Sequence, residues 1–267
     1  MKELLTRSLS GFLYISILLF SIFISKETFI GVFFVFGLIC VYEFQKLIHL
    51  KNKWLYVIFT VLILAVNFTT IHPYFLYFLL TATVLTELLL VRDLLIIRII
   101  PMFEKKKYMT SIFYLITAIA FLTMIPTFRG EYEPFIVAGS FFIMWTNDTF
   151  AYLVGKNFGK HKLLERISPN KTIEGFVGGM CFGLIAAVII ALSTQTLSLL
   201  IWLFISLILS IFGTLGDLIQ SKFKRQAGVK DSGSIMPGHG GIFDRLDSII
   251  FASPFLFVFL QLLQYVS

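Results

Sequence analysis

Long apolar runs alternate with short polar connectors along the whole chain of 267 residues. A helix needs about 20 predominantly apolar residues to cross the hydrocarbon core of a bilayer. Runs of roughly that length lie near 9–25, 29–46, 54–70, 74–91, 109–127, 134–154, 175–193, 197–219 and 248–266. The pattern therefore predicts an all-α integral membrane protein with about nine transmembrane helices.

Two of the boundaries between these runs rest on turn-forming residues rather than on charge. The stretch from Asn67 to Pro73 separates the third run from the fourth, and the polar tetrapeptide 193–196 separates the seventh from the eighth. Such clusters favour a break in a helix. The stretch 175–219 is also far too long for a single crossing, so two helices are expected there.

Composition supports a membrane protein with one domain. Hydrophobic residues make up 58% of the chain and charged residues only 14%, whereas about a quarter of a soluble domain is charged. No polar stretch is long enough for a second domain. We therefore expect a single polytopic membrane domain over 1–267, with membrane helices in 1–133 and the catalytic part in 134–267. The two long polar loops, 155–174 and 220–247, belong to that second part.

The distribution of basic residues predicts the orientation in the membrane. Nine crossings place the N-terminus and both long loops on one side. That side then carries all of the 22 lysine and arginine residues except Lys26 and Arg129. Basic residues accumulate in cytoplasmic loops, so the N-terminus and both loops are expected in the cytoplasm and the C-terminus opposite. The localisation predicted is the cytoplasmic membrane, with the active site facing the cytoplasm.

The formal net charge of +7 raises the question of an acidic partner. In a membrane protein, this balance fits the anionic cytoplasmic leaflet and phosphate-bearing substrates. No nucleic-acid partner is expected.

Four acidic residues fall within the predicted spans, where ionisable groups are costly and point to function. Glu43 and Glu87 lie within a turn or two of predicted helix ends. There, a carboxylate that reaches the interface or pairs with a basic neighbour is an equally good explanation. Asp148 lies deeper in its span, and Asp217 leads directly into the second polar loop.

Glycines follow Asp148 at helical spacing, at Gly155 and Gly159. One interpretation is an acid that points into a cavity, with the glycines allowing another helix or a substrate to approach closely. The alternative is a packing seam of small residues, which is common in membrane helices. Both interpretations can hold together.

The first polar loop ends in a segment that resembles the start of a helix. Ser168 is the expected N-cap and Pro169 lies in the expected first turn. Lys171 has no part in capping. A cation beside the exposed N–H groups of a helix start is a candidate anion contact.

The segment 217–247 holds the densest candidate chemistry in the chain. Asp217, Ser221, Lys224 and Arg225 are expected on one face of an extended helix. Asp244 and Asp247 are expected on one face at the start of the last helix. Between them lies a turn rich in glycine and cations, and its remaining candidates are Lys230, Asp231, Gly238, His239, Gly240, Gly241 and, just after the turn, Arg245.

Such a segment suits phosphoryl or nucleotidyl transfer. Mg²⁺ is held by one or two carboxylates together with phosphate oxygens. Lysine and arginine neutralise charge on transferring phosphates, and glycines expose backbone N–H groups to a phosphate. A basic loop lying on anionic lipid is the plainer explanation. It accounts for the lysines and arginines but not for the acids among them.

His239 lies between glycines, a setting that invites a general-base role. The expected nucleophile is a phosphate oxygen, and a phosphomonoester, with a second pKa of about 6, is largely ionised near neutral pH. It needs no base. We therefore assign His239 to substrate contact or to the shape of the loop.

Two stretches resemble the C-terminal signature of the phosphatidate cytidylyltransferases, also called CDP-diacylglycerol synthases. They are Ser221-x-Phe223-Lys224-Arg225-x4-Lys230-Asp231-x-Gly233 and Pro237-x-His239-Gly240-Gly241-x-x-Asp244-Arg245-x-Asp247. The segments beginning at Asp148, Ser168 and Gly216 are similar to upstream motifs of the same family. The resemblance covers about the last 120 residues, while the N-terminal half is similar in hydropathy only.

The resemblance implies a reaction of CTP with phosphatidate that gives CDP-diacylglycerol and pyrophosphate and requires Mg²⁺. By similarity, Asp217, Asp244 and Asp247 would be metal-site carboxylates. The full catalytic set expected is Asp217, Lys224, Arg225, Lys230, Asp231, Asp244, Arg245 and Asp247. The substrate-binding set expected is Asp148, Lys171, Ser221, Gly238, His239, Gly240 and Gly241. A homodimer is compatible with the sequence.

Two other functions remain open from the sequence. One is a lipid kinase or phosphotransferase, CTP-dependent or not, that acts on an isoprenoid lipid. The other is a transporter whose intramembrane acids carry ions. A transporter predicts inverted repeats and acids near the midplane, whereas most acids here cluster towards one membrane face.

Overall fold

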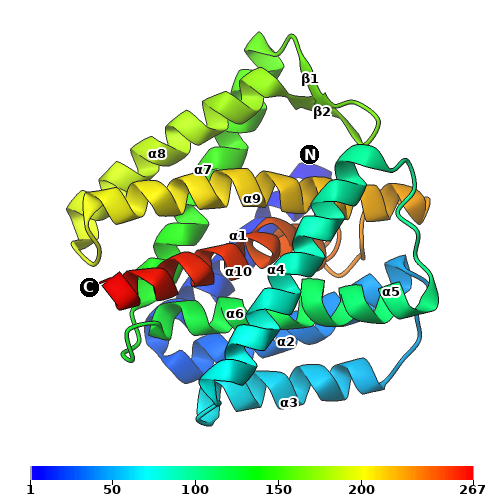
Figure 1. Ribbon diagram of the computed structural model, residues 1–267. Helices are drawn as coiled ribbons and strands as arrows, with labels where there is room; N and C mark the ends of the chain where they lie inside the picture. The colour runs from blue at the N-terminus through cyan, green and yellow to red at the C-terminus, as the bar shows by residue number, and fades with distance from the viewer. Residues whose placement is uncertain (1, 267) are drawn as a thin grey trace.

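The computed structural model describes residues 2–266, with side chains for 6–264. Within that range, nine long helical segments cover the nine predicted apolar runs (Figure 1). Eight are single helices: α1 (Lys2–Ile24), α2 (Lys26–Leu47), α3 (Trp54–Phe68), α4 (Pro73–Ile96), α7 (Pro134–Phe158), α8 (Ile173–Thr194), α9 (Leu199–Gln226) and α10 (Phe243–Val266). The remaining segment is composite: α5 (Glu104–Met109), the π-helical η1 (Thr110–Ile116), α6 (Thr117–Met124) and the 3₁₀ turn η2 (Ile125–Thr127).

Seven of the described segments are long and apolar enough to cross a membrane, which agrees with an all-α membrane protein. They are α1, α2, α4, the composite segment 104–127, α8, α9 and α10. α3 has only 15 residues and spans roughly 22 Å at 1.5 Å per residue. α7 is long, but its second half carries Asn147, Asp148 and Lys156.

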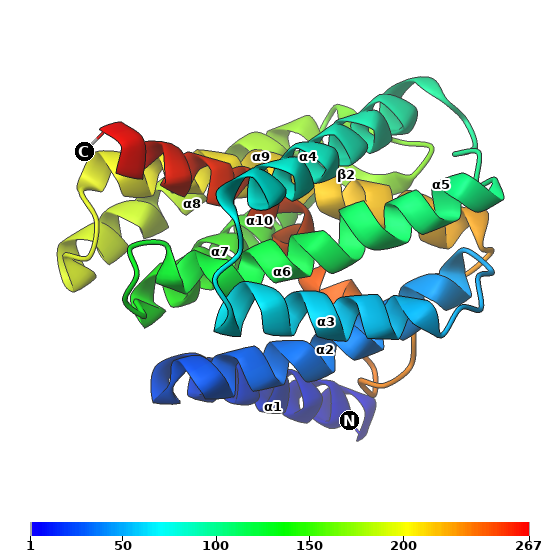
Figure 2. The same ribbon diagram turned by 60° about the horizontal axis from the view of Figure 1, so that its bottom comes forward.

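The helices run side by side, and successive helices run in opposite directions (Figure 2). The marked N- and C-terminal ends consequently lie at opposite ends of the bundle. The segment 227–242 lies at the same end as the N-terminus, and the Ser10 hydroxyl donates to the carbonyl of Pro237 across 3.0 Å. This end of the bundle carries most of the candidate chemistry.

A short β-hairpin replaces the expected helix start at Ser168. β1 (Lys162–Leu164) pairs antiparallel with β2 (Ser168–Thr172), so the prediction of Ser168 as an N-cap is wrong. Strand pairing continues to the helix itself, because the N–H of Ile173 bonds the carbonyl of His161 at 2.9 Å. The N-cap of α8 is instead Thr172, whose hydroxyl accepts the N–H of Gly175 at 3.1 Å.

The two polar loops are shorter than the expected 155–174 and 220–247. α7 continues to Phe158 and α9 to Gln226, while α10 begins at Phe243. Only 159–172 and 227–242 lie outside the helices. The polar ends of α7 and α9 remain helical although they leave the apolar part of the sequence.

α7 and α8 pack backbone to backbone through glycines. A Cβ atom on Gly175 would stand 2.6 Å from the carbonyl oxygen of Ala151 and 3.0 Å from the Cα of Gly155. No side chain larger than hydrogen fits there. The packing interpretation of this seam is therefore confirmed. The close approach also holds the hairpin, which precedes α8, over the end of α7.

Candidate active site

The site forms where α9 and α10 cross. A Cβ atom on Gly216 would lie 2.9 Å from the carbonyl oxygen of Asp247 and 2.6 Å from the Cβ of Phe251. The two backbones are therefore in contact at this glycine. Because Asp217 is the next residue on α9, the crossing brings its carboxylate to the same space as that of Asp247. Both residues line a cavity of about 410 Å³.

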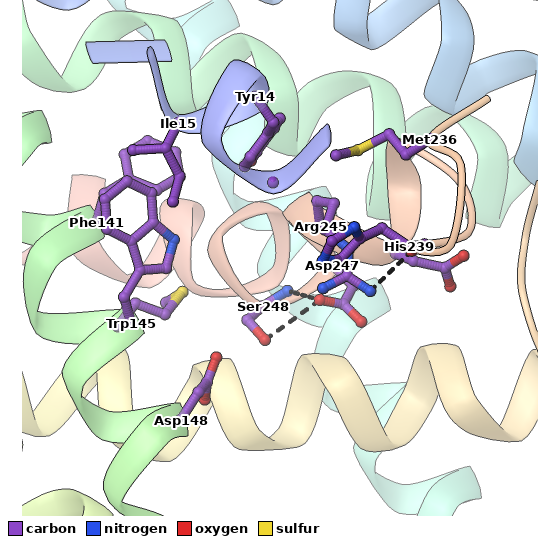
Figure 3. Close-up of a pocket in the computed structure, with 13 residues that line it drawn as sticks. Tyr14, Ile15, Phe141, Trp145, Asp148, Met236, His239, Arg245, Asp247 and Ser248 are labelled. Carbon is purple, nitrogen blue, oxygen red and sulfur yellow. Dashed lines mark hydrogen bonds between the residues drawn. The ribbon is translucent and has the colours of Figure 1, made fainter. Parts of the chain in front are cut away.

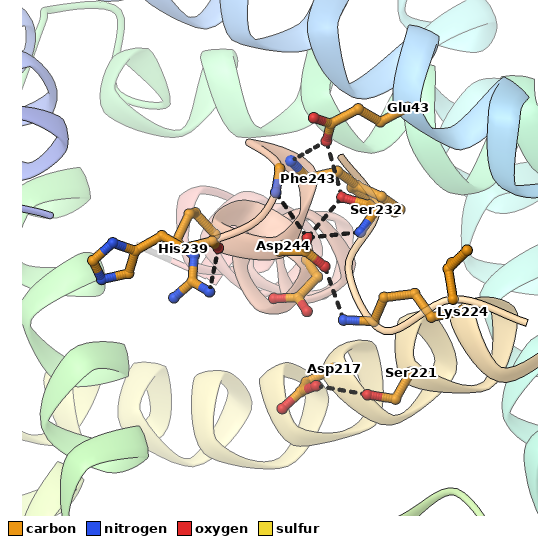
Figure 4. A network of polar contacts seen from close by, with 12 residues as sticks. Glu43, Asp217, Ser221, Lys224, Ser232, His239, Phe243 and Asp244 are labelled. Carbon is orange, nitrogen blue, oxygen red and sulfur yellow. Dashed lines mark hydrogen bonds and ion pairs between the residues drawn. The ribbon is translucent and has the colours of Figure 1, made fainter. Parts of the chain in front are cut away.

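Asp217 is held by a lysine from the hairpin. The Nζ of Lys171, on β2, donates to Oδ2 of Asp217, and the hydroxyl of Ser221 donates to Oδ1 at 3.2 Å (Figure 4). Burial alone would lower the pKa of Lys171, but the adjacent Asp217 carboxylate outweighs burial and raises that pKa above its ordinary value. Lys171 therefore stays charged, and the hairpin contributes a fixed positive charge to the site.

Asp247 is only partly satisfied by its neighbours. Its Oδ1 accepts the N–H of Ser248 at 2.7 Å and the Ser248 hydroxyl at 3.3 Å (Figure 3). No hydrogen bond to Oδ2 is found among the described residues. Asp217 also lies within electrostatic range of Asp247. Two carboxylates that face one cavity repel each other, and this arrangement favours a cation.

Asp244 organises the loop that precedes α10. Its Oδ1 accepts Lys224 Nζ at 2.8 Å, while Oδ2 accepts the N–H of Ser232 at 2.8 Å, its hydroxyl at 3.0 Å and the N–H of Gly241 at 2.9 Å (Figure 4). An ionised carboxylate has about four acceptor positions. Three of these contacts reach Oδ2 and one reaches Oδ1, so Asp244 fixes both the loop and Lys224 while Oδ1 retains an acceptor position.

Glu43, on α2, is a member of this network that the sequence did not assign to the site. Its carboxylate accepts the N–H groups of Phe243 (2.9 Å) and Ile242 (3.3 Å) and lies 3.0 Å from the hydroxyl of Ser232, whose single proton it shares with Asp244. The side chain is buried. No basic residue is among the contacts found for it.

Two glycines of the loop make room for Glu43. A Cβ on Gly233 would lie 2.1 Å from its Oε1, and a Cβ on Gly241 would lie 2.3 Å from its Oε2. In the sequence, these glycines are the one local sign that another group lies very close to the loop. The sequence alone does not pair them with an acid about 190 positions earlier.

The other loop glycines set the position of His239. Gly238 and Gly240 have φ angles of 76° and 85°, in the left-handed region that favours glycine. Between them, His239 turns away from Lys224 and Asp217 (Figure 4). Its Nδ1 lies 2.8 Å from the hydroxyl of Ser10 on α1.

The imidazole of His239 is neutral near pH 7. Burial, together with the charges of Arg245 and Arg7, lowers its pKa below the ordinary value. Arg245 also donates to the backbone carbonyl of His239 at 2.9 Å. The loop, α1 and α10 are thereby joined around this histidine.

A second cavity, of about 220 Å³, opens between α1, α7 and this loop (Figure 3). His239 and Arg245 form its polar wall, and Tyr14, Phe141 and Trp145 are aromatic residues that line it. It shares five lining residues with the 410 Å³ cavity: Asp148, Asp244, Arg245, Asp247 and Ser248. The two cavities therefore converge on the carboxylates of α10.

Most of the predicted site residues do come together. The 410 Å³ cavity is lined by eight of them: Asp148, Lys171, Asp217, Lys224, Asp231, Asp244, Arg245 and Asp247. Ser221 reaches this group through Asp217, whereas Gly238, Gly240 and Gly241 shape the loop beside it.

Arg225 and Lys230 do not join this group. The prediction that Arg225 shares a helix face with Asp217 is wrong, because eight residues carry it roughly 80° round the helix. Its Nη1 lies 3.5 Å from the carbonyl of Val229, and the side chain lines a different cavity. Lys230 is exposed on the loop. Their membership of the catalytic set stays a prediction.

The carboxylates fit a cation that is shared with a substrate. Among the described residues, no three His, Cys, Asp or Glu side chains gather closely enough to hold a metal by themselves. Asp217 and Asp247 provide two carboxylates on one cavity, and Mg²⁺ commonly binds to one or two carboxylates together with substrate phosphates. The donor set therefore suits Mg²⁺.

Comparison with known proteins shows which protein family the chain belongs to. The model of the cytidylyltransferase family matches residues 5–263, nearly the whole chain. The chain belongs to this family. Its matched range includes α1 and α2, so the helices that supply Ser10 and Glu43 are part of the family's own architecture.

Named relatives resemble the chain over a shorter stretch. Phosphatidate cytidylyltransferases of Staphylococcus haemolyticus and Staphylococcus aureus are 52% and 53% identical to it over 122 residues. That of Bacillus subtilis is 52% identical over 121 residues. Each match covers 45% of this chain and 45–47% of the relative. Less than half the length of these cytidylyltransferases is therefore compared.

Proposed function

We propose that this chain is a phosphatidate cytidylyltransferase, which transfers CMP from CTP to phosphatidate and yields CDP-diacylglycerol and pyrophosphate. The observation that carries the proposal is the meeting of two cavities of different character at Asp244 and Asp247, beside Asp217. One cavity is lined by lysines and polar residues, and the other by aromatic residues of two helices. A hydrophilic and a lipid substrate need such a pair. The names of the similar proteins support the same reaction.

CTP is assigned to the 410 Å³ cavity. Lys171, Lys224 and Arg245 line it, and cations of this kind stabilise the charge on nucleotide phosphates during transfer. The hairpin that carries Lys171 lies at its edge. The same cations would neutralise the departing pyrophosphate.

Phosphatidate is assigned to the cavity between α1 and α7. His239 and Arg245 would contact its phosphate, while the acyl chains remain among apolar residues. Support comes from a third cavity of about 240 Å³, which is lined mainly by apolar side chains of α1, α7 and α8. It shares Trp145 with the 220 Å³ cavity that would hold the lipid phosphate. A lipid could enter from the bilayer along this route.

Mg²⁺ would be held by Asp217 and Asp247 together with phosphate oxygens of the nucleotide. When bound, it would neutralise negative charge on those phosphates. Asp244 was also predicted as a ligand. Its Oδ2 is surrounded by donors of Ser232 and Gly241, while its Oδ1 accepts only Lys224, so ligation by Asp244 would use Oδ1 beside Lys224.

In the proposed reaction, an oxygen of the lipid phosphate attacks the α-phosphorus of CTP. A new P–O bond forms, the bond between the α- and β-phosphates breaks, and its electron pair leaves with pyrophosphate. The attacking phosphate is already ionised near neutral pH, so no protein group has to accept a proton. The protein orients both phosphates and balances their charge.

The proposal includes the finer topology. All nine long segments would cross the membrane, with α3 and the second half of α7 in thinner or more polar surroundings. The N-terminus, the hairpin and the segment 227–242 would face the cytoplasm, where CTP is available. The strong bias of lysine and arginine towards that side supports this orientation.

The decisive assay uses purified protein in lipid nanodiscs with CTP, phosphatidate and Mg²⁺. We expect CDP-diacylglycerol and pyrophosphate in equal amounts. Asp217→Asn and Asp247→Asn should each abolish turnover without loss of folding, whereas Glu131→Gln, an exposed acid away from the site, should keep it. In a parallel assay with an isoprenoid alcohol in place of phosphatidate, release of CDP with a newly phosphorylated isoprenoid lipid would favour the kinase alternative instead. Normal turnover by either aspartate variant would remove that residue from the metal site.

A further inference from the structure

A separate cavity of about 660 Å³ lies behind the hairpin and is surrounded by cations. Four of its seven lining residues are basic, Arg98, Arg166, Lys222 and Arg225, and no carboxylate lines it. They come from three segments: the connector after α4, the turn between β1 and β2, and the end of α9. The hairpin lies beside the end of α4 in Figures 1 and 2.

No carboxylate of the described residues lies in the cavity wall to balance its positive charge. Among the described residues, Arg98 and Arg166 have no hydrogen bond or ion pair, and Arg225 has only the carbonyl of Val229. Lys222 donates to backbone carbonyls at the end of α4, including that of Asp93 at 2.6 Å. It lies within electrostatic range of Arg166, so these like charges repel each other.

The acid close to Lys222, Asp93, is already occupied. The carboxylate of Asp93, which is buried, accepts Lys106 and lies 2.8 Å from Nη2 of Arg92. It has little capacity left for a third cation. A ligand that brings its own negative charge would relieve the repulsion among the four basic residues.

We propose that this basic cavity binds a phosphate-bearing ligand, and that in the membrane this ligand is the headgroup of an anionic lipid. Guanidinium groups bind phosphate through paired hydrogen bonds, and three are present. The cavity lies on the side with most of the lysines and arginines, where anionic lipids attract basic groups. Exposed Leu95, Ile96 and Ile99 beside Arg98 provide an apolar surface for the acyl chains.

A bound headgroup would attach the hairpin to α9 at a second point. The first attachment is the ion pair between Lys171 and Asp217. Arg166 lies in the turn of the same hairpin, and Arg225 lies near the end of α9. A phosphate that joins them would hold Lys171 in place from behind, so Arg166 is a positioning residue. Turnover should then rise with the content of anionic lipid that is not itself a substrate.

The test measures lipid retention and turnover separately; the turnover measurement rests on the proposed function, whereas the retention measurement does not depend on it. The full chain is placed in nanodiscs of phosphatidylcholine with increasing phosphatidylglycerol, and retained phosphatidylglycerol is measured by native mass spectrometry. The Arg98→Gln/Arg166→Gln variant should bind it at least about tenfold more weakly, since each lost charged contact is worth about tenfold. The matched control is Lys51→Gln/Lys53→Gln, two exposed cations on the same predicted side, which should retain it like the wild type.

Turnover at a fixed fraction of phosphatidate provides the second measurement. Phosphatidylglycerol should stimulate the wild type and the lysine control several-fold more than the arginine variant. Equal retention and equal stimulation in all three proteins would overturn the proposal. Pyrophosphate or inorganic phosphate is added to protein in neutral detergent as a third arm. Arginine-dependent binding of these ions without arginine-dependent lipid retention would overturn the lipid as the ligand.

Discussion

The carboxylate of Glu43 accepts the backbone N–H of Phe243, the first residue of α10, at 2.9 Å. α2 thus holds the start of the helix that carries Asp244 and Asp247. Glu43→Gln would turn an NH₂ group towards donors and leave at least one of them unsatisfied in a buried place. Such a loss costs about 1–3 kcal/mol. We expect a lower Tm in detergent and a strong fall in turnover.

The control for this change is Glu27→Gln, an exposed acid at the start of the same helix. It should leave both Tm and turnover unchanged. If Glu43→Gln melted and turned over like the wild type, Glu43 would not hold the loop. Tm by differential scanning fluorimetry and turnover by pyrophosphate release are the two measurements.

A second prediction concerns the crossing of α9 and α10. The added methyl group of Gly216→Ala would meet the carbonyl of Asp247 and the Cβ of Phe251. The helices must then separate, and overpacking of this kind costs about 1–3 kcal/mol. The carboxylates of Asp217 and Asp247 would then move apart. We therefore expect a strong fall in turnover in a protein that still folds.

Gly31→Ala is the matched substitution, since nothing lies within 4 Å of the Cβ that it adds. It should preserve turnover. Equal activity of the two alanine variants would show that the close crossing is not needed for catalysis. The dependence of turnover on Mg²⁺ gives an additional measurement, and we expect Gly216→Ala to need more Mg²⁺ for half-maximal activity.

The sequence predicted the helical segments well because bilayer-length apolar runs are a strong local signal. It also predicted the meeting of Asp217, Asp244 and Asp247, since these residues flank one short connection. The helix start at Ser168 was wrong for a local reason. Ser and Pro favour a helix N-terminus, but pairing between β1 and β2 continues to Thr172, and only tertiary structure decides between the two.

Glu43 could not be assigned from the sequence for a different reason. Its partners, Ile242 and Phe243, are about 200 positions away and contribute backbone groups that any residue possesses. Hydropathy and spacing carry no information about such contacts. The prediction for Arg225 was wrong because of helix geometry. Lys224 contacts Asp244, whereas Arg225, the next residue, lines a separate cavity.

Lys171 provides a prediction about substrate affinity. Lys171→Met would remove the cation beside Asp217, and we expect a higher KM for CTP together with a lower kcat. Lys171→Arg should restore part of both values because it keeps the charge. The pKa of Lys171 is raised, so it stays protonated well above neutral pH and adds no limb to the profile between pH 6 and 9. An alkaline limb in that window that disappears in Lys171→Arg would contradict this assignment.

Orientation is tested by cysteine labelling in intact cells. Cysteines at Ser234 and Glu131, both exposed positions, are introduced one at a time after replacement of the exposed Cys181 with alanine. The remaining cysteine, Cys40, is buried. An impermeant maleimide should label position 131 from outside and position 234 only after permeabilisation. Labelling of position 234 in intact cells would reverse the proposed topology.

His239 is expected to contact substrate and not to act as a general base. Its imidazole is neutral at pH 7 because burial and nearby arginines lower its pKa, and its Nδ1 is occupied by Ser10. A neutral imidazole could accept a proton, so the protonation state alone does not decide the role. The decisive point is the nucleophile. An ionised lipid phosphate has no proton to give up before it attacks.

The two roles differ in the pH dependence of turnover. General-base catalysis is typically worth about 10²–10⁴-fold, and loss of a base would also remove the acid limb of the profile. We expect His239→Ala to lose less than this and to keep the acid limb, because ionisation of the lipid phosphate sets it. Ser10→Ala, which removes only the orienting hydroxyl, should produce a smaller loss of the same kind. Measurement of kcat/KM against pH for the three proteins decides between the roles. A large fall with no acid limb in His239→Ala would make the histidine the base and the proposed mechanism wrong.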